Sequence, residues 1–147
     1  MSGLDELYKE VILDHYRSPR NRGKLDPSDF DLHRDNPLCG DEVHLFGVVE
    51  DGQLTGIAFE GKGCSISQAS TSMMTEKVKG VSIAEAEELA KLFKSMMQGE
   101  VSPDPDKLGD LAALQGVQKY PVRIKCALLG WNTLLEGLKA YKEKQGS

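Results

Sequence analysis

The sequence predicts an α+β fold in which a small three-stranded antiparallel sheet is packed with helices. Apolar residues follow a helical spacing at both ends of the chain, whereas between residues 30 and 60 they follow the alternation of strands. The 147 residues contain no internal repeat, low-complexity tract or linker, so one domain spanning residues 1–147 with a single core is expected. Apolar residues make up 39% and charged residues 28%, which is typical of a globular chain.

The first half of the chain is expected to form one helix and then the sheet. Residues 4–17 carry apolar side chains at helical spacing, which predicts an amphipathic helix. Two β-rich runs, 43–49 and 54–59, are separated by a turn that contains Asp51-Gly52, and an Asp-Gly pair between such runs favours a hairpin. A third strand is expected around residues 31–35.

The second half of the chain is expected to be helical. One helix should run from Gly63 to Gly80, and Ser82 with Glu85 forms a capping box that predicts the start of the next. Gly99 should end that helix, because glycine favours helix C-termini. A loop, a short helical piece near residues 108–114 and a last helix from about residue 121 should complete the fold.

Charge and hydropathy narrow the possible functions. The net charge of −5 argues against a nucleic-acid partner. No apolar run is long enough to cross a bilayer and the amino terminus lacks a secretory pattern, so a cytoplasmic protein without a membrane partner is expected. In such a compartment three cysteines are a poor disulfide framework, which leaves packing residues, reactive thiols or metal ligands.

Each cysteine lies at a junction between expected elements. Cys39 precedes the hairpin with Asp41 two residues on, Cys64 begins a helix, and Cys126 is early in the last helix. A helix N-terminus favours thiolate over thiol, and Arg123 beside Cys126 acts in the same direction. Lys125 is the second basic neighbour of Cys126.

Three sulfurs and one carboxylate oxygen suit tetrahedral zinc or iron. The chain has no Cys-x-x-Cys pair, so spacing alone leaves a metal site and three small buried packing residues about equally open. His15, His33 and His44 have no ligand spacing to a cysteine and are expected to be surface or packing residues. The serine-rich run 65–72 has no recognisable histidine base and is expected to pack a helix face.

Four segments together resemble the iron–sulfur assembly proteins of the NifU/IscU type, most closely the SufU-like branch. The segments are YKEVILDHYRSPRN (8–21), NPLCGD (36–41), GKGCSIS (61–67) and YPVRIKCALL (120–129). The resemblance runs from about residue 7 to 138 and implies a SufE/NifU-like fold. It also implies that Cys39, Asp41, Cys64 and Cys126 are the metal or cluster ligands.

Two departures from the scaffold-type IscU pattern favour the SufU-like branch. Lys125 stands where scaffold-type members carry histidine, and the chain contains an additional stretch at about 97–118. The branch implies a zinc site and a sulfur acceptor, at most a zinc-dependent sulfurtransferase, which works with a pyridoxal-phosphate cysteine desulfurase and with downstream cluster-assembly proteins. Cys39 would take up the sulfur, with Cys126 as the alternative, and Arg123 would offset the negative charge or meet the desulfurase.

Two other functions remain open at this point. The same ligands could assemble a transient [2Fe–2S] cluster, made labile by the Asp41 carboxylate, although Lys125 counts against that. The chain could also be a structural zinc module that only binds partners. Structural sites rarely use a carboxylate where cysteine would close them, which disfavours this last reading.

Overall fold

The computed structural model describes residues 3–37, 40–102 and 104–145. Its elements, in chain order, are α1 (Gly3–Arg17), β1 (Phe30–Asn36), β2 (Asp41–Glu50), β3 (Gln53–Lys62), α2 (Ser65–Val78), α3 (Ile83–Met97), α4 (Pro105–Leu108), the 3-10 helix η1 (Gly109–Lys119) and α5 (Pro121–Gln145). The predicted α+β class is confirmed.

The three strands form one antiparallel sheet in the order β1-β2-β3. The β2–β3 hairpin turns at Asp51 and Gly52, whose φ angles of 52° and 75° are both positive, as a tight hairpin turn with the twist of the strands requires. At the other end of the hairpin Glu42 pairs with Lys62, and in the neighbouring ladder Asn36 pairs with Asp41. The first residues of β2 therefore lie beside the last residues of β3.

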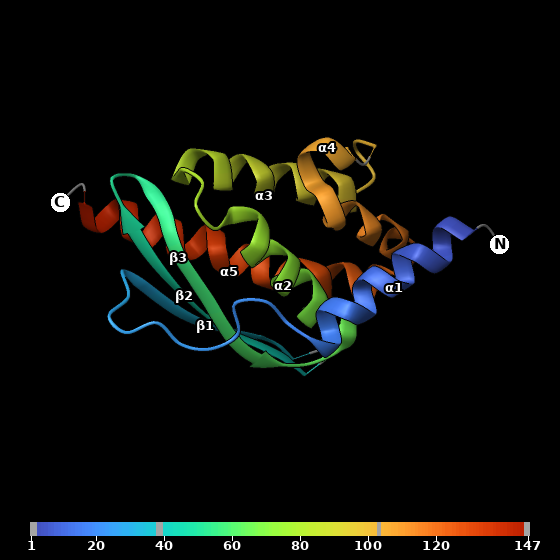
Figure 1. The fold of residues 1–147 in the computed structure, drawn as a ribbon, viewed down its shortest axis with the longest axis horizontal. Coiled ribbons are helices and arrows are strands. Elements are labelled where there is room, and N and C mark those ends of the chain that lie inside the picture. The colour runs from blue at the N-terminus through green and yellow to red at the C-terminus, as the bar shows by residue number, and fades with distance from the viewer. Residues whose placement is uncertain (1–2, 38–39, 103, 146–147) are drawn as a thin grey trace.

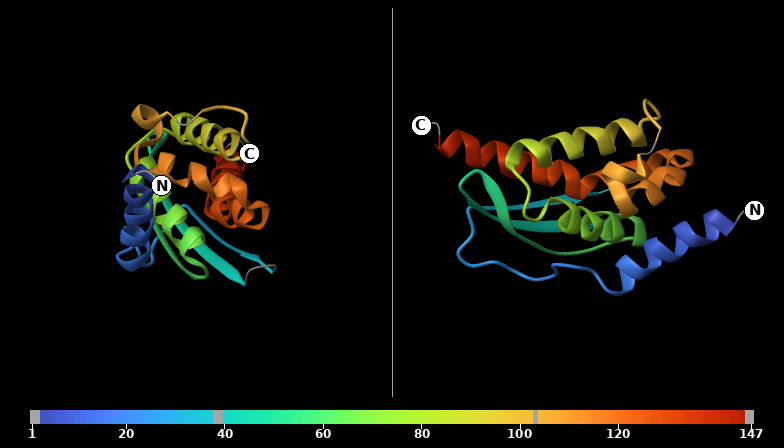
Figure 2. Two further views of the ribbon diagram at one scale, coloured as in Figure 1. Left: turned by 90° about the vertical axis from the view of Figure 1, so that its right-hand side faces the viewer. Right: turned by 45° about the horizontal axis from the view of Figure 1, so that its top comes forward.

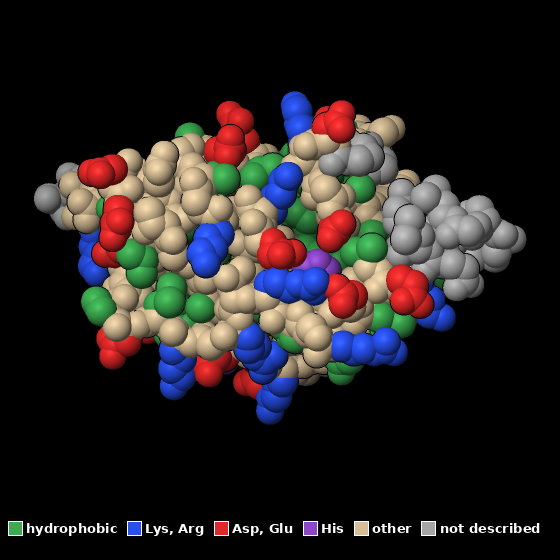
Figure 3. Space-filling view, viewed as in Figure 1, with side chains coloured by type: hydrophobic (Ala, Val, Ile, Leu, Met, Phe, Trp, Pro, Cys, Tyr) green, Lys and Arg blue, Asp and Glu red, His purple; other side chains and the backbone are tan. Residues whose placement is uncertain are grey.

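The helices gather on one face of the sheet (Figures 1 and 2). The long helix α5 packs against β1 and β2, and α2 packs between α5, α1 and β3. The core lies between these layers, where the rings of Phe93 and Trp131 stack with centroids 5.2 Å apart. Acidic and basic side chains are interspersed on the face seen in Figure 3.

The helical piece expected near residues 108–114 is longer in the structure, where α4 and η1 together span residues 105–119. Its buried residues Leu108, Leu111, Leu114 and Val117 recur at steps of three. A 3-10 helix has 3.0 residues per turn, so these four side chains fall on one face of η1. No helix in the described part of the chain is both long and apolar enough to cross a membrane.

Candidate metal centre

The structure brings together three of the four residues that the sequence indicates as ligands. Asp41 begins β2, Cys64 directly precedes α2, and Cys126 lies near the start of α5. One ligand atom from each residue lies within 4.8 Å of the other two. The fourth residue, Cys39, lies outside the described residues, in the connection between the paired residues Asn36 and Asp41.

Asp41 is held in place by the backbone that precedes α2. Its side chain is fully buried, and its Oδ1 accepts the backbone N–H of Cys64 at 2.8 Å. The neighbouring Gly63 has φ of +149°, and a Cβ there would overlap the Asp41 carboxylate and lie 2.9 Å from its Cγ. Only glycine therefore lets the chain pass this close to the carboxylate, a role that the sequence alone did not indicate.

Cys64 is the N-cap of α2, and its Sγ accepts the backbone N–H of Ser67 at 3.4 Å. The Cys64 thiol therefore lies at the N-terminus of α2, as the sequence predicted. Cys126 is different, because it is buried within the second turn of α5 and its Sγ lies 3.6 Å from the carbonyl oxygen of Val122. The predicted place of Cys126, one to two turns after Pro121, is confirmed.

Arg123 is a basic residue that interacts with both Cys64 and Cys126. It is exposed one turn before Cys126, and the negative charge of Cys64 raises the pKa of its guanidinium above the ordinary value. A hydrogen bond to Cys64 and the charge of Cys126 act in the same direction. Lys125, the other basic neighbour expected to help, is exposed.

The geometry of the described donors fits a tetrahedral metal. Bonds of about 2.3 Å to sulfur and about 2.1 Å to oxygen at a tetrahedral angle separate the two donors by about 3.6 Å. The observed distance between Cys64 Sγ and Asp41 Oδ2 is 3.8 Å. Two sulfurs and one carboxylate oxygen supply three of four tetrahedral positions and leave one for a further ligand.

The histidines do not contribute to this centre. His33 and His44 pair across β1 and β2, and His44 lies on the face opposite to Asp41, as strand alternation predicts. His15 is buried and its Nδ1 lies 2.8 Å from Ser72 Oγ, so the expectation that no histidine accompanies the serine-rich run is wrong. Ser72 is nevertheless fully buried and already accepts the backbone N–H of Arg20 at 2.8 Å, which leaves no access for a substrate.

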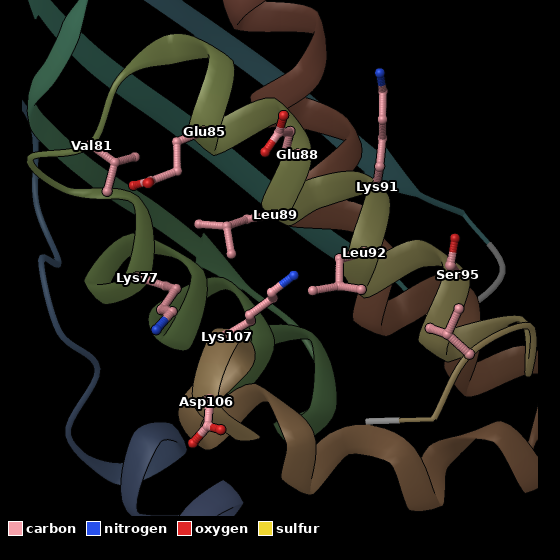
Figure 4. Close-up of a pocket in the computed structure, with 11 residues that line it drawn as sticks. Lys77, Val81, Glu85, Glu88, Leu89, Lys91, Leu92, Ser95, Asp106 and Lys107 are labelled. Carbon is pink, nitrogen blue, oxygen red and sulfur yellow. The ribbon is translucent and has the colours of Figure 1, made fainter. Parts of the chain in front are cut away.

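Several hollows lie beside the helices. One, of about 640 Å³, lies between α2, α3 and α4, and no cysteine is among the described residues that line it (Figure 4). Lys77 in this lining is 13 residues beyond Cys64, which corresponds to about 20 Å along α2. A second hollow, of about 510 Å³, adjoins the thiols, because Ile66, Tyr120 and Arg123 line it.

The fold and the centre together define a small α+β protein in which two thiols and one carboxylate are gathered closely enough to hold a metal ion. Residues 7–127 match the family model described as the NifU-like N terminal domain, and the chain belongs to this family. It is 47% identical to the zinc-dependent sulfurtransferase SufU of Bacillus subtilis, over 99% of this chain and 97% of that protein.

Two further comparisons agree with the family. The iron-sulfur cluster assembly scaffold protein IscU of Streptococcus pyogenes is 43% identical, over 99% of this chain and 91% of that protein. The crystal structure of a putative iron-sulfur cluster assembly scaffold protein for the SUF system from Fervidobacterium islandicum superposes with a TM-score of 0.84 at 37% identity. That superposition covers 90% of this chain and 97% of the other.

Proposed function

We propose that this chain is an iron–sulfur cluster assembly protein that accepts sulfur on Cys39 and binds zinc through Cys39, Asp41, Cys64 and Cys126. The observation that carries the proposal is the convergence of the Asp41, Cys64 and Cys126 ligand atoms within 4.8 Å of one another. Its similarity to a relative named as a zinc-dependent sulfurtransferase supports the same reading. Zinc, when bound, keeps its thiol ligands deprotonated at neutral pH.

The sulfur would come from a persulfide on a pyridoxal-phosphate cysteine desulfurase. The Cys39 thiolate attacks the outer sulfur of that persulfide, a new S–S bond forms, the donor S–S bond breaks, and the desulfurase cysteine leaves as a thiolate. The sulfur atom changes carrier without net oxidation. A downstream cluster-assembly protein then takes the sulfur from Cys39 by the same exchange.

Cys39 suits the acceptor role better than Cys126 does. It is followed by Gly40, whose φ of +69° is easily accessible to glycine, in a short connection between two strands. The Cys126 Sγ is buried within a helix and lies against a backbone carbonyl. Arg123 is exposed and lies near both Cys64 and Cys126, so it can offset the negative charge of the site or meet the incoming persulfide.

A second candidate function is the assembly of a transient [2Fe–2S] cluster on the same ligands. The scaffold IscU relative at 43% identity favours this candidate, as does Asp41, because a carboxylate ligand makes a cluster easier to release. Metal analysis of protein purified without oxygen separates the two functions. Tightly held zinc that iron does not displace supports the sulfur acceptor, and a coloured cluster supports the scaffold.

Mass spectrometry after incubation with a cysteine desulfurase and cysteine tests the proposal. We expect one added sulfur on Cys39 in the wild type and none in Cys39→Ser. Arg123→Ala should slow the uptake, whereas Lys125→Ala is the matched control, because Lys125 is exposed on the same helical turn. If Cys39→Ser still takes up sulfur and stimulates the desulfurase fully, the proposed acceptor is wrong.

A further inference from the structure

A second group of ligand-type side chains lies away from the thiols, where three helices meet. His15 comes from the last turn of α1, Glu76 from α2 and Asp110 from the start of η1. One ligand atom from each lies within 4.8 Å of the others, the same limit that the three donors around Cys64 meet. Figure 3 shows a histidine among acidic and basic side chains at the junction of these helices.

The histidine is the unusual member of the group. Only 1% of the His15 side chain is exposed, and its Nε2 faces Glu76 Oε1 and Asp110 Oδ2, both at 3.5 Å. Both distances exceed those of ordinary N–H···O hydrogen bonds, and they are equal. A buried imidazole nitrogen that faces two carboxylate oxygens in this way suits a shared cation as well as an ion pair.

The rest of the ring is arranged as in a metal-binding histidine. Nδ1 lies 2.8 Å from Ser72 Oγ, which can accept a hydrogen bond from Nδ1–H. In that tautomer Nε2 carries no proton and can bind a cation. A cation about 2.1 Å from nitrogen and oxygen ligands separates them by about 3.0 Å at the octahedral angle and by about 3.4 Å at the tetrahedral angle. The two observed distances from Nε2 are each 3.5 Å.

Charge and access also favour a cation. The Arg20 guanidinium lies 2.7 Å from Asp14 and 3.9 Å from Glu76, so its closer ion pair is with a residue outside the group. Glu76 and Asp110 are 47% and 62% exposed and line a hollow of about 270 Å³, which has room for water ligands. Lys77 lines the same hollow and weakens the negative potential, so a reversible site is expected.

We propose that His15, Glu76 and Asp110 form a second cation site that takes a divalent first-row transition metal through one imidazole and two carboxylates. The site is independent of the thiol centre and of the function proposed for it. A cation there joins α1, α2 and η1, so its binding stabilises the packing of these helices on one another. The ligand set is harder than the thiol set and suits Mn²⁺ or Fe²⁺ better than the thiols do.

Titration of the zinc-loaded protein with Mn²⁺, followed by paramagnetic broadening in NMR spectra, tests the site. The broadening should centre on His15 and its neighbours, and the melting temperature should rise with Mn²⁺. Asp110→Asn and Glu76→Gln should each weaken Mn²⁺ binding by more than about tenfold. Loss of a residue that only supports a ligand already lowers metal affinity by about tenfold or more, and these two residues are ligands themselves. These exposed residues can be changed without emptying the core, unlike His15.

Two controls make the result specific. Asp106→Asn removes an exposed carboxylate of α4 outside the group and should leave Mn²⁺ binding unchanged. Cys64→Ser changes the thiol centre and should leave the broadening at His15 unchanged. The proposal is overturned if Mn²⁺ does not broaden the His15 region, if Asp110→Asn binds Mn²⁺ as the wild type does, or if the broadening disappears with Cys64→Ser.

Discussion

Replacing Gly63 by alanine should damage the metal centre through Asp41 rather than through a thiol. The new Cβ would overlap the Asp41 carboxylate and lie 3.0 Å from the Asp41 Cα, so the side chain must leave its position. The φ of +149° adds backbone strain. Moving Asp41 also removes the hydrogen bond that its Oδ1 accepts from Cys64.

The size of the effect follows from these two terms. Strain of this kind costs about 1 to 3 kcal/mol, and a hydrogen bond to a charged group contributes about 1.5 to 3 kcal/mol. Gly63→Ala should therefore lower the free energy of unfolding of the metal-free protein by about 2.5 to 6 kcal/mol. It should also weaken zinc binding by more than about tenfold, because a ligand is displaced.

Alanine substitutions at two other glycines separate the effect of backbone strain from the effect of displacing Asp41. Gly80 has φ of +87° with no atom within 4 Å of an added Cβ, so Gly80→Ala introduces strain without a clash. Gly116 has neither a positive φ nor a close neighbour, so Gly116→Ala should change little. Urea unfolding gives the stability of each variant, and competition with a chromogenic chelator gives its zinc affinity. Wild-type zinc affinity in Gly63→Ala, or an equal loss of affinity in Gly80→Ala, would refute the reasoning.

Three more predictions concern pH, packing and metal removal. The hydrogen bond from Arg20 holds the pKa of Asp14 below its ordinary 3.8, so the pair stabilises the fold above that pH and loses its effect as pH falls through the lowered folded-state pKa. The stability difference between wild type and Asp14→Asn in urea should therefore shrink in acid, and a difference that persists there contradicts the assignment. Trp131→Ala should lower the free energy of unfolding by about 3 to 5 kcal/mol, since the side chain is fully buried. Urea unfolding followed by circular dichroism measures this loss, and a loss below about 1 kcal/mol would contradict the packing. Zinc at about 100 times its Kd should add about 2.7 kcal/mol to the free energy of unfolding. A chelator should therefore lower the melting temperature of the wild type but not of Cys64→Ser.

Local patterns explain why much of the fold could be predicted from the sequence. The hairpin depended on Asp51-Gly52, and the start of α3 on Ser82, whose side chain accepts the N–H of Glu85 as a capping box requires. The extent of η1 differs from the prediction because apolar residues at steps of three follow the period of a 3-10 helix rather than that of an α-helix. That signal was present in Leu108, Leu111, Leu114 and Val117.

The candidate site was predictable only in part. The resemblance indicated which residues should converge, and β2–β3 pairing explains how Asp41 reaches Cys64. The contact between Gly63 and Asp41 depends on residues 22 positions apart, and no local pattern encodes it. The same holds for His15, which meets Glu76 and Asp110 only after three helices have packed together.

X-ray absorption at the zinc edge of freshly purified protein is the measurement that tests the central claim most directly. Three cysteines and one aspartate around a single ion predict three sulfur neighbours at about 2.3 Å and one oxygen at about 2.0 to 2.2 Å. Cys39→Ser should lose one of those sulfurs. A zinc-free protein, a shell dominated by nitrogen, or a spectrum that Cys39→Ser leaves unchanged would contradict the account.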